Sequence, residues 1–215
     1  MSQNRSTAVM QRRVEAHDSL EDFPTPPWAT RALCEWLLGL DMDISLDAQT
    51  VREPAANRGH MVRPLAEYFA EVRASDVHDY GVGFPVADYL FGPADQLDLT
   101  DWTITNPPFR LAEQFIARAL ETSRMGVAMI LRTSFLEGVG RFERLFSIRR
   151  PSWALQFTER VVMHKGKLSA NGSTATSYAW LVWQHGKSGT RLDWIAPCRR
   201  HLERATDYQN QDLAA

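Results

Sequence analysis

The chain has 215 residues, 44% of them hydrophobic, so it is long enough for one globular domain with a substantial core. No apolar run approaches the roughly 18 residues that a membrane-spanning helix needs. Cys34 and Cys198 lie too far apart to indicate a disulfide framework or a metal site. We therefore expect no bound metal. The polar N-terminus lacks the apolar stretch of a signal peptide, so we expect a cytoplasmic protein.

The net charge of −2 conceals an uneven distribution of charged residues. Between Arg110 and Arg204 there are 16 Lys and Arg against 7 Asp and Glu, whereas the remainder of the chain has 8 basic and 19 acidic residues. Such a basic half indicates a polyanionic partner, in particular a nucleic acid, because clustered cations bind phosphates. Arg-rich helix surfaces that arose by chance would give the same count.

The N-terminal half predicts a β-α-β unit. A Pro-rich stretch, "FPTPPW", leads into a helix that ends near Leu40 and can be capped by Thr25. A short strand is expected near Thr50–Glu53, followed by a loop of small residues and a helix near His60–Phe69. A second strand over Glu71–Ser75 completes the unit from which parallel sheets are built.

The C-terminal half continues the alternation of strands and helices. After an irregular stretch, a strand ends at Asn106, and an amphipathic helix follows over residues 110–124. Residues 125–133 are almost continuously apolar, which is typical of a strand buried on both faces. The remaining elements expected here are a short helix and two strands, over 140–148, 152–157 and 176–184. The expected parts of the chain are a flexible arm, one doubly wound α/β domain and a polar tail, over 1–22, 23–200 and 201–215.

Polar residues follow three of the predicted strands where these strands end. In open parallel sheets ligands bind at the carboxyl ends of the strands, which is where Glu53, Asp76 and Asn106 are expected. The loop "EPAANRGHM" offers free backbone amides, and Asn57 and Gly59 can adopt positive φ. Asp76 can accept hydrogen bonds from a ribose diol. A bare βα turn and an aspartate that caps the next turn are the alternatives.

The corner Asn106-Pro107-Pro108-Phe109 is the most specific motif. Two prolines remove two backbone donors and end the strand. Asn106 Oδ1 and the Pro107 carbonyl can accept both N–H groups of a conjugated amine, which makes its lone pair available for attack on an electrophilic carbon. Phe109 can stack on the ring that carries the amine, and no strong general base is required. The alternative is a purely structural turn.

Two further segments are candidates for ligand contact. Asp88, in "VADYLFG", can accept a hydrogen bond from an exocyclic amine; the alternative, which the segment taken alone favours, is an exposed loop aspartate without a role. Residues 158–177 are polar and basic and contain Gly and Ser, as expected of a mobile loop that contacts substrate. A disordered hairpin connection is the alternative for this loop.

The motif "TNPPF" resembles the catalytic motif of class I S-adenosylmethionine-dependent methyltransferases that act on exocyclic amines, in particular DNA adenine-N6 methyltransferases. "EPAANRGHM" is similar to their cofactor loop, and "FPTPPWATRAL" is similar to an N-terminal cofactor motif of several of these enzymes. The resemblance extends from Phe23 to Gln184. It implies a Rossmann-like methyltransferase fold, which is a doubly wound, mostly parallel seven-stranded sheet with an antiparallel last strand, "SYAWLVWQ".

The resemblance also implies roles for individual residues. Family members usually carry Gly where this chain has Asn57, and this departure concerns cofactor binding and turnover. The implied catalytic residues are Asn106, Pro107, Pro108 and Phe109. The implied contacts to S-adenosylmethionine are Glu53 at the methionine amine, Ala55, Asn57 and Gly59 along the loop, Asp76 at the ribose, Asp88 at the adenine, and Pro26 and Trp28 over the methionine end.

The implied activity is methyl transfer to the N6 amino group of adenine in DNA, with short or relaxed sequence specificity. A target base in duplex DNA has to be flipped out of the stack. The expected phosphate contacts are Arg110, Arg118, Arg149, Arg150, Arg160, Lys165 and Lys167. RNA adenine, protein glutamine and a methyltransferase-like binding protein without turnover remain alternatives, as do a monomer and a homodimer.

Overall fold

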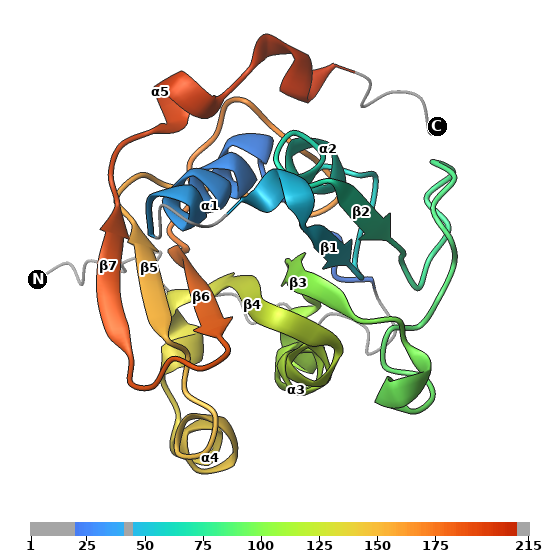
Figure 1. Cartoon of the computed structure of the whole chain (residues 1–215). Coiled ribbons are helices and arrows are strands. Elements are labelled where there is room, and N and C mark those ends of the chain that lie inside the picture. The colour runs from blue at the N-terminus through green and yellow to red at the C-terminus, as the bar shows by residue number, and fades with distance from the viewer. Residues whose placement is uncertain (1–19, 41–44, 210–215) are drawn as a thin grey trace, which may run out of the picture.

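The computed structural model describes residues 20–40 and 45–209. In this part of the chain the strands are β1 (Thr50–Glu53), β2 (Glu71–Ala74), β3 (Thr100–Thr105), β4 (Ser123–Arg132), β5 (Trp153–Phe157), β6 (Tyr178–Gln184) and β7 (Arg191–Ile195). They form one sheet in the order β2-β1-β3-β4-β6-β5-β7, as Figure 1 shows.

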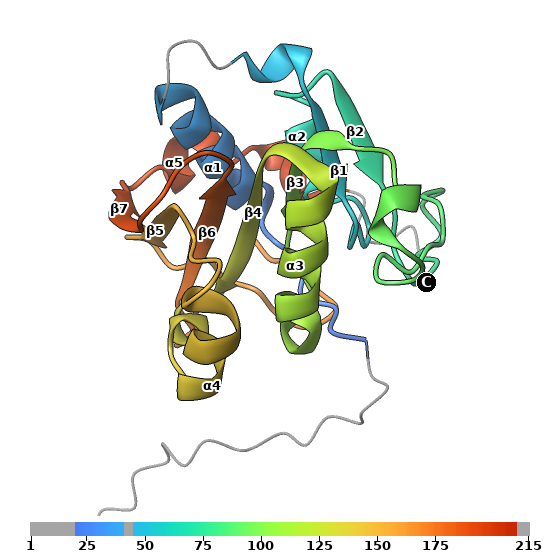
Figure 2. The same cartoon turned by 60° about the horizontal axis from the view of Figure 1, so that its bottom comes forward.

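The helices cover both faces of this sheet. They are α1 (Pro27–Leu40), α2 (Val62–Leu65), α3 (Ala112–Thr122), α4 (Val139–Arg141) and α5 (Arg199–Leu202), the 3₁₀ helices η1 (Leu46–Ala48), η2 (Ala94–Gln96), η3 (Phe109–Leu111), η4 (Thr133–Leu136) and η6 (Ala205–Tyr208), and the π-helix η5 (Phe142–Phe146). Helices α1, α2 and α5 lie on one face and α3 and α4 on the other (Figures 1 and 2). None of the described helices combines the length and the apolar character of a membrane span.

The strand directions confirm the predicted doubly wound, mostly parallel sheet. Strands β2, β1, β3 and β4 are parallel neighbours, whereas β6 runs antiparallel to both β4 and β5. The antiparallel strand expected over 176–184 is therefore β6. Strand β7, which is parallel to β5 at the edge of the sheet, follows it. The sequence prediction did not include β7, whose side chains Leu192 and Trp194 are exposed and give no strong burial pattern.

Strand β4, at the centre of the sheet, explains the near-continuous apolar run over residues 125–133. In β4, Val127 and Met129 belong to the core beneath α3, whereas Ala128 and Ile130 belong to the core beneath α1. The alternation follows from the two-residue period of a strand, and both faces are covered by helices. Each fully buried large side chain stabilises the fold by roughly 1.5–3 kcal/mol.

One predicted helix is shorter than the sequence indicated. The helix expected over His60–Phe69 is limited to α2, and the chain beyond it closes i→i+3 turns at Glu67 and Tyr68. Its apolar residues still face the core, since Leu65 and Phe69 are buried against α1. Burial there does not require a full helix.

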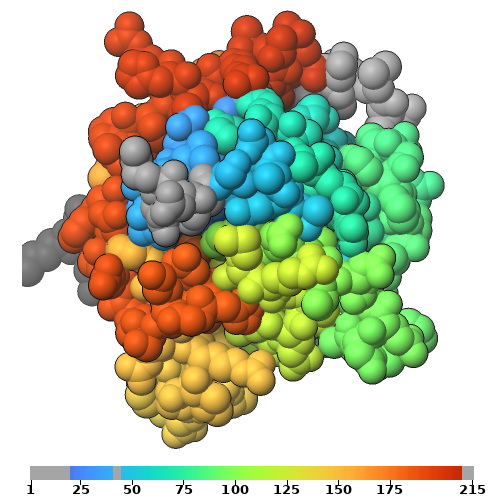
Figure 3. Space-filling view, viewed as in Figure 1, coloured from blue at the N-terminus to red at the C-terminus, as the bar shows by residue number. Residues whose placement is uncertain are grey.

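The packed part of the chain extends beyond 23–200 at both ends. Arg31 of α1 is buried and donates bidentate hydrogen bonds to Asp207, with N–O distances of 2.8 Å, and it also pairs with Glu67 at 2.8 Å. The carbonyl of Leu202 accepts a further hydrogen bond from Arg31 at 2.7 Å. Figure 3 shows the corresponding C-terminal segment along the top of the molecule. A residue of the expected polar tail thus completes a buried ion-pair network.

The Arg31 network predicts a specific loss of stability. Burial opposes ionisation of Asp207, but the hydrogen bonds from Arg31 lower the pKa of this carboxyl below its ordinary value. We expect Asp207→Ala to reduce the free energy of unfolding by about 3 kcal/mol, because it leaves a buried guanidinium with one carboxylate fewer. Urea denaturation at neutral pH measures this change.

The matched control is Glu71→Ala, which removes an exposed partner of Arg73. Exposed ion pairs contribute little, so this variant should unfold close to wild type. A similar loss in both variants would contradict the role of the buried network.

Candidate functional site

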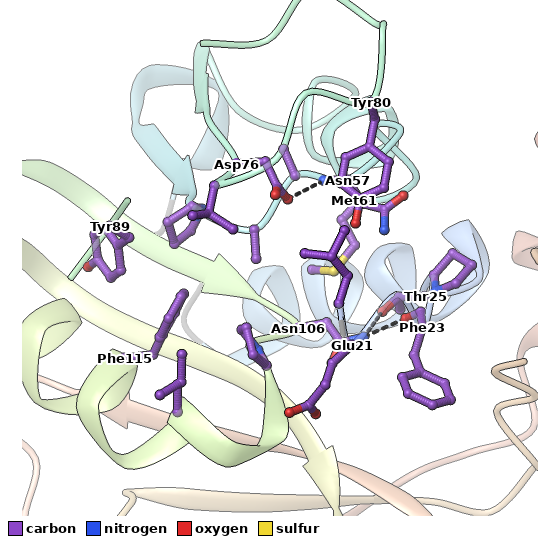
Figure 4. Close-up of a pocket in the computed structure, with 18 of the residues that line it drawn as sticks. Glu21, Phe23, Thr25, Asn57, Met61, Asp76, Tyr80, Tyr89, Asn106 and Phe115 are labelled. Carbon is purple, nitrogen blue, oxygen red and sulfur yellow. Dashed lines mark hydrogen bonds between the residues drawn. The ribbon is translucent and has the colours of Figure 1, made fainter. Parts of the chain in front are cut away.

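The carboxyl ends of β1, β2 and β3 meet at a cavity of about 180 Å³ (Figure 4). The loop after β1 contributes residues 54–57, β2 is followed by Asp76 and Val77, and β3 by Asn106 and Pro108. The N-terminal segment 20–25 forms another wall, without Asp22. The convergence predicted from the three strand ends is therefore present in the fold.

The loop after β1 has the backbone conformation that its sequence predicts. Asn57 has φ of +49° and Gly59 has φ of +80°. Asparagine tolerates this left-handed region better than most residues with a Cβ. Its side-chain amide donates to Asp22 Oδ1 at 2.6 Å, and Arg58 binds the other oxygen of the same carboxylate at 2.9 Å. Asp22, in the range expected as an arm, fastens this loop.

Asp76 is buried at the end of β2 and orders the loop across from it. Its Oδ2 accepts a hydrogen bond from the Asn57 amide and its Oδ1 accepts one from the His78 amide, both at 2.9 Å. A carboxylate has about four acceptor positions, so the group retains capacity for a ligand hydroxyl. Asp88 lies at the exposed rim of the cavity, where its Oδ1 accepts from the Leu90 amide at 2.9 Å.

Glu53 is fully buried at the end of β1. Its Oε1 accepts hydrogen bonds from Thr105 Oγ1 at 2.6 Å and from the Ala55 amide at 3.0 Å, while Oε2 is buried without a partner among the described residues. Burial raises the pKa of this carboxyl to about 8, because desolvation outweighs the two hydrogen bonds. The group therefore holds its proton at neutral pH, unless a cation lies beside it.

The amide of Asn106 is held in one orientation. Its Nδ2 lies 2.8 Å from the Phe23 carbonyl and 3.0 Å from Thr25 Oγ1. A carbonyl oxygen only accepts, so the atom that faces Phe23 has to be the NH₂ group. Oδ1 is consequently turned the other way, where it is buried and has no hydrogen-bond partner in the described structure. Figure 4 shows this amide beside Thr25 and Phe23.

The ring of Phe109 lies at the boundary of the cavity rather than in its lining. It packs between Phe23, with ring centroids 5.8 Å apart, and the guanidinium of Arg132, 4.5 Å from the ring centroid. The Phe109 amide donates to Glu21 Oε2 at 2.8 Å. Pro107 is buried beneath this corner. The corner thus stands between the cavity and a groove on the α3 side, which Phe109 lines.

Some of the predicted site residues line the cavity and others do not. The lining contains Ala55, Asn57, Asp76, Asp88, Asn106 and Pro108. Glu53, Gly59, Pro26, Pro107 and Phe109 lie next to lining residues in sequence but do not line the cavity themselves. Trp28 requires a correction, because it is 1% exposed and packs edge-on against Phe157 in the core, with ring centroids 5.6 Å apart. Thr25 and Pro24 form the wall that was expected from Pro26 and Trp28.

Several apolar and aromatic residues of the lining were not predicted from the sequence. They are Phe23, Met61, Tyr80, Tyr89, Leu111 and Phe115. Arg58 stacks over the Tyr80 ring at 4.9 Å, so this ring is held at the cavity. Tyr80 lies in an irregular stretch with no periodicity to indicate its direction, and Phe115 reads as an ordinary core residue of an amphipathic helix.

The residues expected to contact phosphate do not form one continuous face. Arg110 pairs with Glu21 at 2.8 Å, and Arg118 donates to the carbonyls of Phe91 and Gly92. The others fall into two groups. Arg160, Lys165 and Lys167 are in the loop that follows the carboxyl end of β5. Arg149 and Arg150 precede β5 and so lie toward its amino end.

Comparison with known proteins identifies the fold. No protein-family model and no curated protein matches the chain. Among solved structures, the methyltransferase subunit of a type I restriction-modification system from Streptococcus thermophilus superposes with a TM-score of 0.60 at 12% identity, covering 80% of this chain and 47% of that one. A proposed class I S-adenosylmethionine-dependent methyltransferase from Listeria monocytogenes gives 0.59 at 10% identity, covering 79% and 64%.

Magnesium protoporphyrin IX methyltransferase from Synechocystis, solved with bound S-adenosylmethionine, gives a TM-score of 0.51 at 14% identity and covers 75% of this chain and 79% of that one. The chain spans about half the length of the restriction-system subunits that it matches. Likeness at this identity shows the fold, which is the Rossmann-like fold of class I S-adenosylmethionine-dependent methyltransferases.

The raised pKa of Glu53 predicts a pH dependence of stability. The folded chain retains this proton up to about pH 8, whereas an ordinary glutamate loses it near 4.5. The folded state therefore binds more protons between these values, and the free energy of unfolding should decrease as the pH rises through this range. We expect Glu53→Gln to remove this decrease, as measured by urea denaturation at a series of pH values.

Glu71→Gln, at an exposed position on β2, is the control and should retain the wild-type slope. Identical pH profiles for wild type and Glu53→Gln would show that this carboxyl does not titrate as its burial requires.

Proposed function

We propose that the chain transfers a methyl group from S-adenosylmethionine to the N6 amino group of adenine in DNA, with short or relaxed sequence specificity. The observation that supports this best is the Asn106 amide. Its NH₂ group donates to the Phe23 carbonyl and to Thr25 Oγ1, and its carbonyl oxygen, beside the cavity, has no hydrogen-bond partner among residues 20–40 and 45–209. A buried acceptor without a donor raises the free energy of the folded state, and a hydrogen bond from an incoming N–H group removes this cost.

The corner supplies the chemistry that a weakly nucleophilic amine requires. Asn106 Oδ1 and the Pro107 carbonyl accept the two N–H bonds of the target amine, which localises the nitrogen lone pair for attack. S-adenosylmethionine supplies a methyl group on a positively charged sulfur, from which it leaves with the sulfur retaining the bonding electrons. The methylated ammonium then releases its proton to water, so Asn106 acts by positioning and preorganised dipoles and not as a base.

The cavity has the hydrogen-bond acceptors and the apolar surface that S-adenosylmethionine needs. Asp76 offers acceptor positions to a ribose diol, and the backbone of residues 54–57 approaches closely. Tyr80 and Phe115 provide apolar surface for a purine. Buried Glu53, next to Ala55 at this wall, is an acceptor for the methionine ammonium, and a neighbouring cation favours its ionised form.

The choice of DNA rests on the basic half of the chain and on what similar structures do. The modification subunits of restriction systems share the fold. RNA adenine and protein glutamine present a similar amine, and the Asn106 corner does not distinguish these polymers. A binding protein without turnover would keep the fold and need not bind the cofactor.

The test offers labelled S-adenosylmethionine to the protein with duplex DNA, single-stranded DNA, RNA or a protein extract, and identifies the methylated unit by mass after digestion. We expect N6-methyladenine from DNA with wild type and a loss of at least about 100-fold with Asn106→Ala, since removal of one preorganised dipole commonly costs that much. Label in RNA or protein instead would show that the substrate is that polymer and not DNA. No label and no cofactor binding by calorimetry would contradict the enzyme hypothesis.

The hydrogen bond from Asn106 to Thr25 predicts a positioning effect. Thr25→Val removes the acceptor and preserves the shape, so we expect kcat to fall about tenfold, as for one lost hydrogen bond of about 1.4 kcal/mol. Thr25→Ser keeps the hydroxyl and should retain most of the activity. Steady-state kinetics on the accepted polymer measures both variants, and equal losses in the two would exclude this role of the hydroxyl.

A further inference from the structure

A second depression begins where the cavity ends. It is a groove of about 700 Å³ between α3 on one side and α4 and η5 on the other, and Phe109 lies at one end of it. Figures 1 and 2 show α3 and α4 as neighbours on the same face of the sheet. We call it the α3–α4 groove; its lining is Phe109, Arg110, Glu113, Gln114, Ala117, Phe135, Arg141, Arg144, Leu145, Ile148 and Arg149.

The α3–α4 groove is cationic with an apolar floor. Four arginines and one carboxylate, Glu113, line it. Arg141 and Arg144 both contact Glu113, at 3.4 and 3.0 Å, whereas Arg110 pairs with Glu21, outside the lining, at 2.8 Å. Arg144 remains 66% exposed and Arg149 47% exposed in their side chains, the latter 4.0 Å from Glu121. One carboxylate shared by two guanidiniums leaves net positive charge, which complements an anion.

The apolar part of the groove is exposed at Ile148, which is 72% exposed. Phe135 and Leu145 are buried and form the floor, and Arg141 lies over the Phe135 ring at 4.0 Å. The wall contains the π-helix η5, a rare conformation that is frequent at functional sites. Arginines over apolar and aromatic surface are the combination with which proteins bind single-stranded nucleic acid.

The groove and the cavity meet at the corner from opposite sides. Asn106 and Pro108 line the cavity, whereas the next residue, Phe109, lines the groove. A methyl transfer requires donor and acceptor on opposite sides of the transferred group. A base whose amine binds at Asn106 would place its backbone near Phe109, at the mouth of the α3–α4 groove.

We propose that the α3–α4 groove binds the sugar-phosphate backbone of the nucleic-acid strand next to the target base. The volume of the groove, about 700 Å³, is in the range of sites for small ligands, which is enough for a few nucleotides of one strand and too small for a duplex. The occupant is therefore a single-stranded segment, either free or displaced from a duplex. Arg141 and Arg144, absent from the phosphate contacts predicted from sequence, belong to this surface, whereas Arg160, Lys165 and Lys167 do not.

Binding to the groove is measurable without catalysis. Fluorescence anisotropy with a labelled single-stranded oligodeoxynucleotide gives Kd for the full chain at several salt concentrations. We expect the double variant Arg144→Ala/Arg149→Ala to weaken binding about tenfold at low salt. The slope of log Kd against log salt should decrease by about 1.4, as two lost contacts to a single strand predict.

The matched control is Arg73→Ala, which removes a partly exposed, ion-paired arginine on β2 at the far edge of the sheet. It should bind as wild type does. Thermal unfolding of all variants verifies that they are folded. Equal binding by wild type and the double variant, or equal losses in the double variant and Arg73→Ala, would overturn the proposal.

Further arms separate the possible occupants. A duplex of the same sequence should bind more weakly, and single-stranded RNA, which shares the backbone, should also depend on Arg144 and Arg149. The proposal would be overturned if binding of an acidic peptide depended on these arginines while binding of the oligonucleotide did not, because the groove would then be a protein site. The identity of the base rests on the proposed function. Binding to the groove is measured without S-adenosylmethionine and without turnover, so failure of methyl transfer and failure of the groove are distinguishable.

Discussion

The parallel pairing of β1, β2 and β3 is the constraint on which the candidate site depends. Strands paired in one direction end at one edge of the sheet, and the loops that follow them have to meet there. Glu53, Asp76 and Asn106 lie more than twenty residues apart in sequence. They share this end of the sheet because the ladders align Glu53 with Ala74 and Arg52 with Thr103. The cavity is a consequence of that geometry.

A short acidic segment before α1 joins the parts of this edge. Glu21 accepts from the Phe109 amide, and Asp22 binds the side chains of Asn57 and Arg58. The next residue, Phe23, provides the carbonyl that orients the Asn106 amide. The same few residues therefore hold the loop after β1 and the corner after β3, so a change in this segment is expected to affect both.

The arginines divide into those that build the fold and those that remain available to a partner. Arg31 is buried with two carboxylates and secures the C-terminal segment, whereas Arg144 and Arg149 are exposed beside an apolar floor. Net charge along the sequence does not separate these roles, because burial decides them. The net charge of a stretch of sequence therefore does not show which of its arginines are exposed.

Local patterns in the sequence were sufficient for the doubly wound α/β fold, for β1 to the residue and for the left-handed backbone at Asn57 and Gly59. These features depend on near neighbours, namely apolar periodicity, proline at the ends of elements, and the φ that Asn and Gly tolerate. Only the tertiary structure decided that Trp28 belongs to the core and that Asp207 pairs with Arg31. The same holds for the orientation of Asn106 by Thr25 and Phe23, and for the groove between α3 and α4. Each of these is a contact between distant parts of the chain, whose partners are selected by packing and by the burial of charge, and no local pattern encodes that selection.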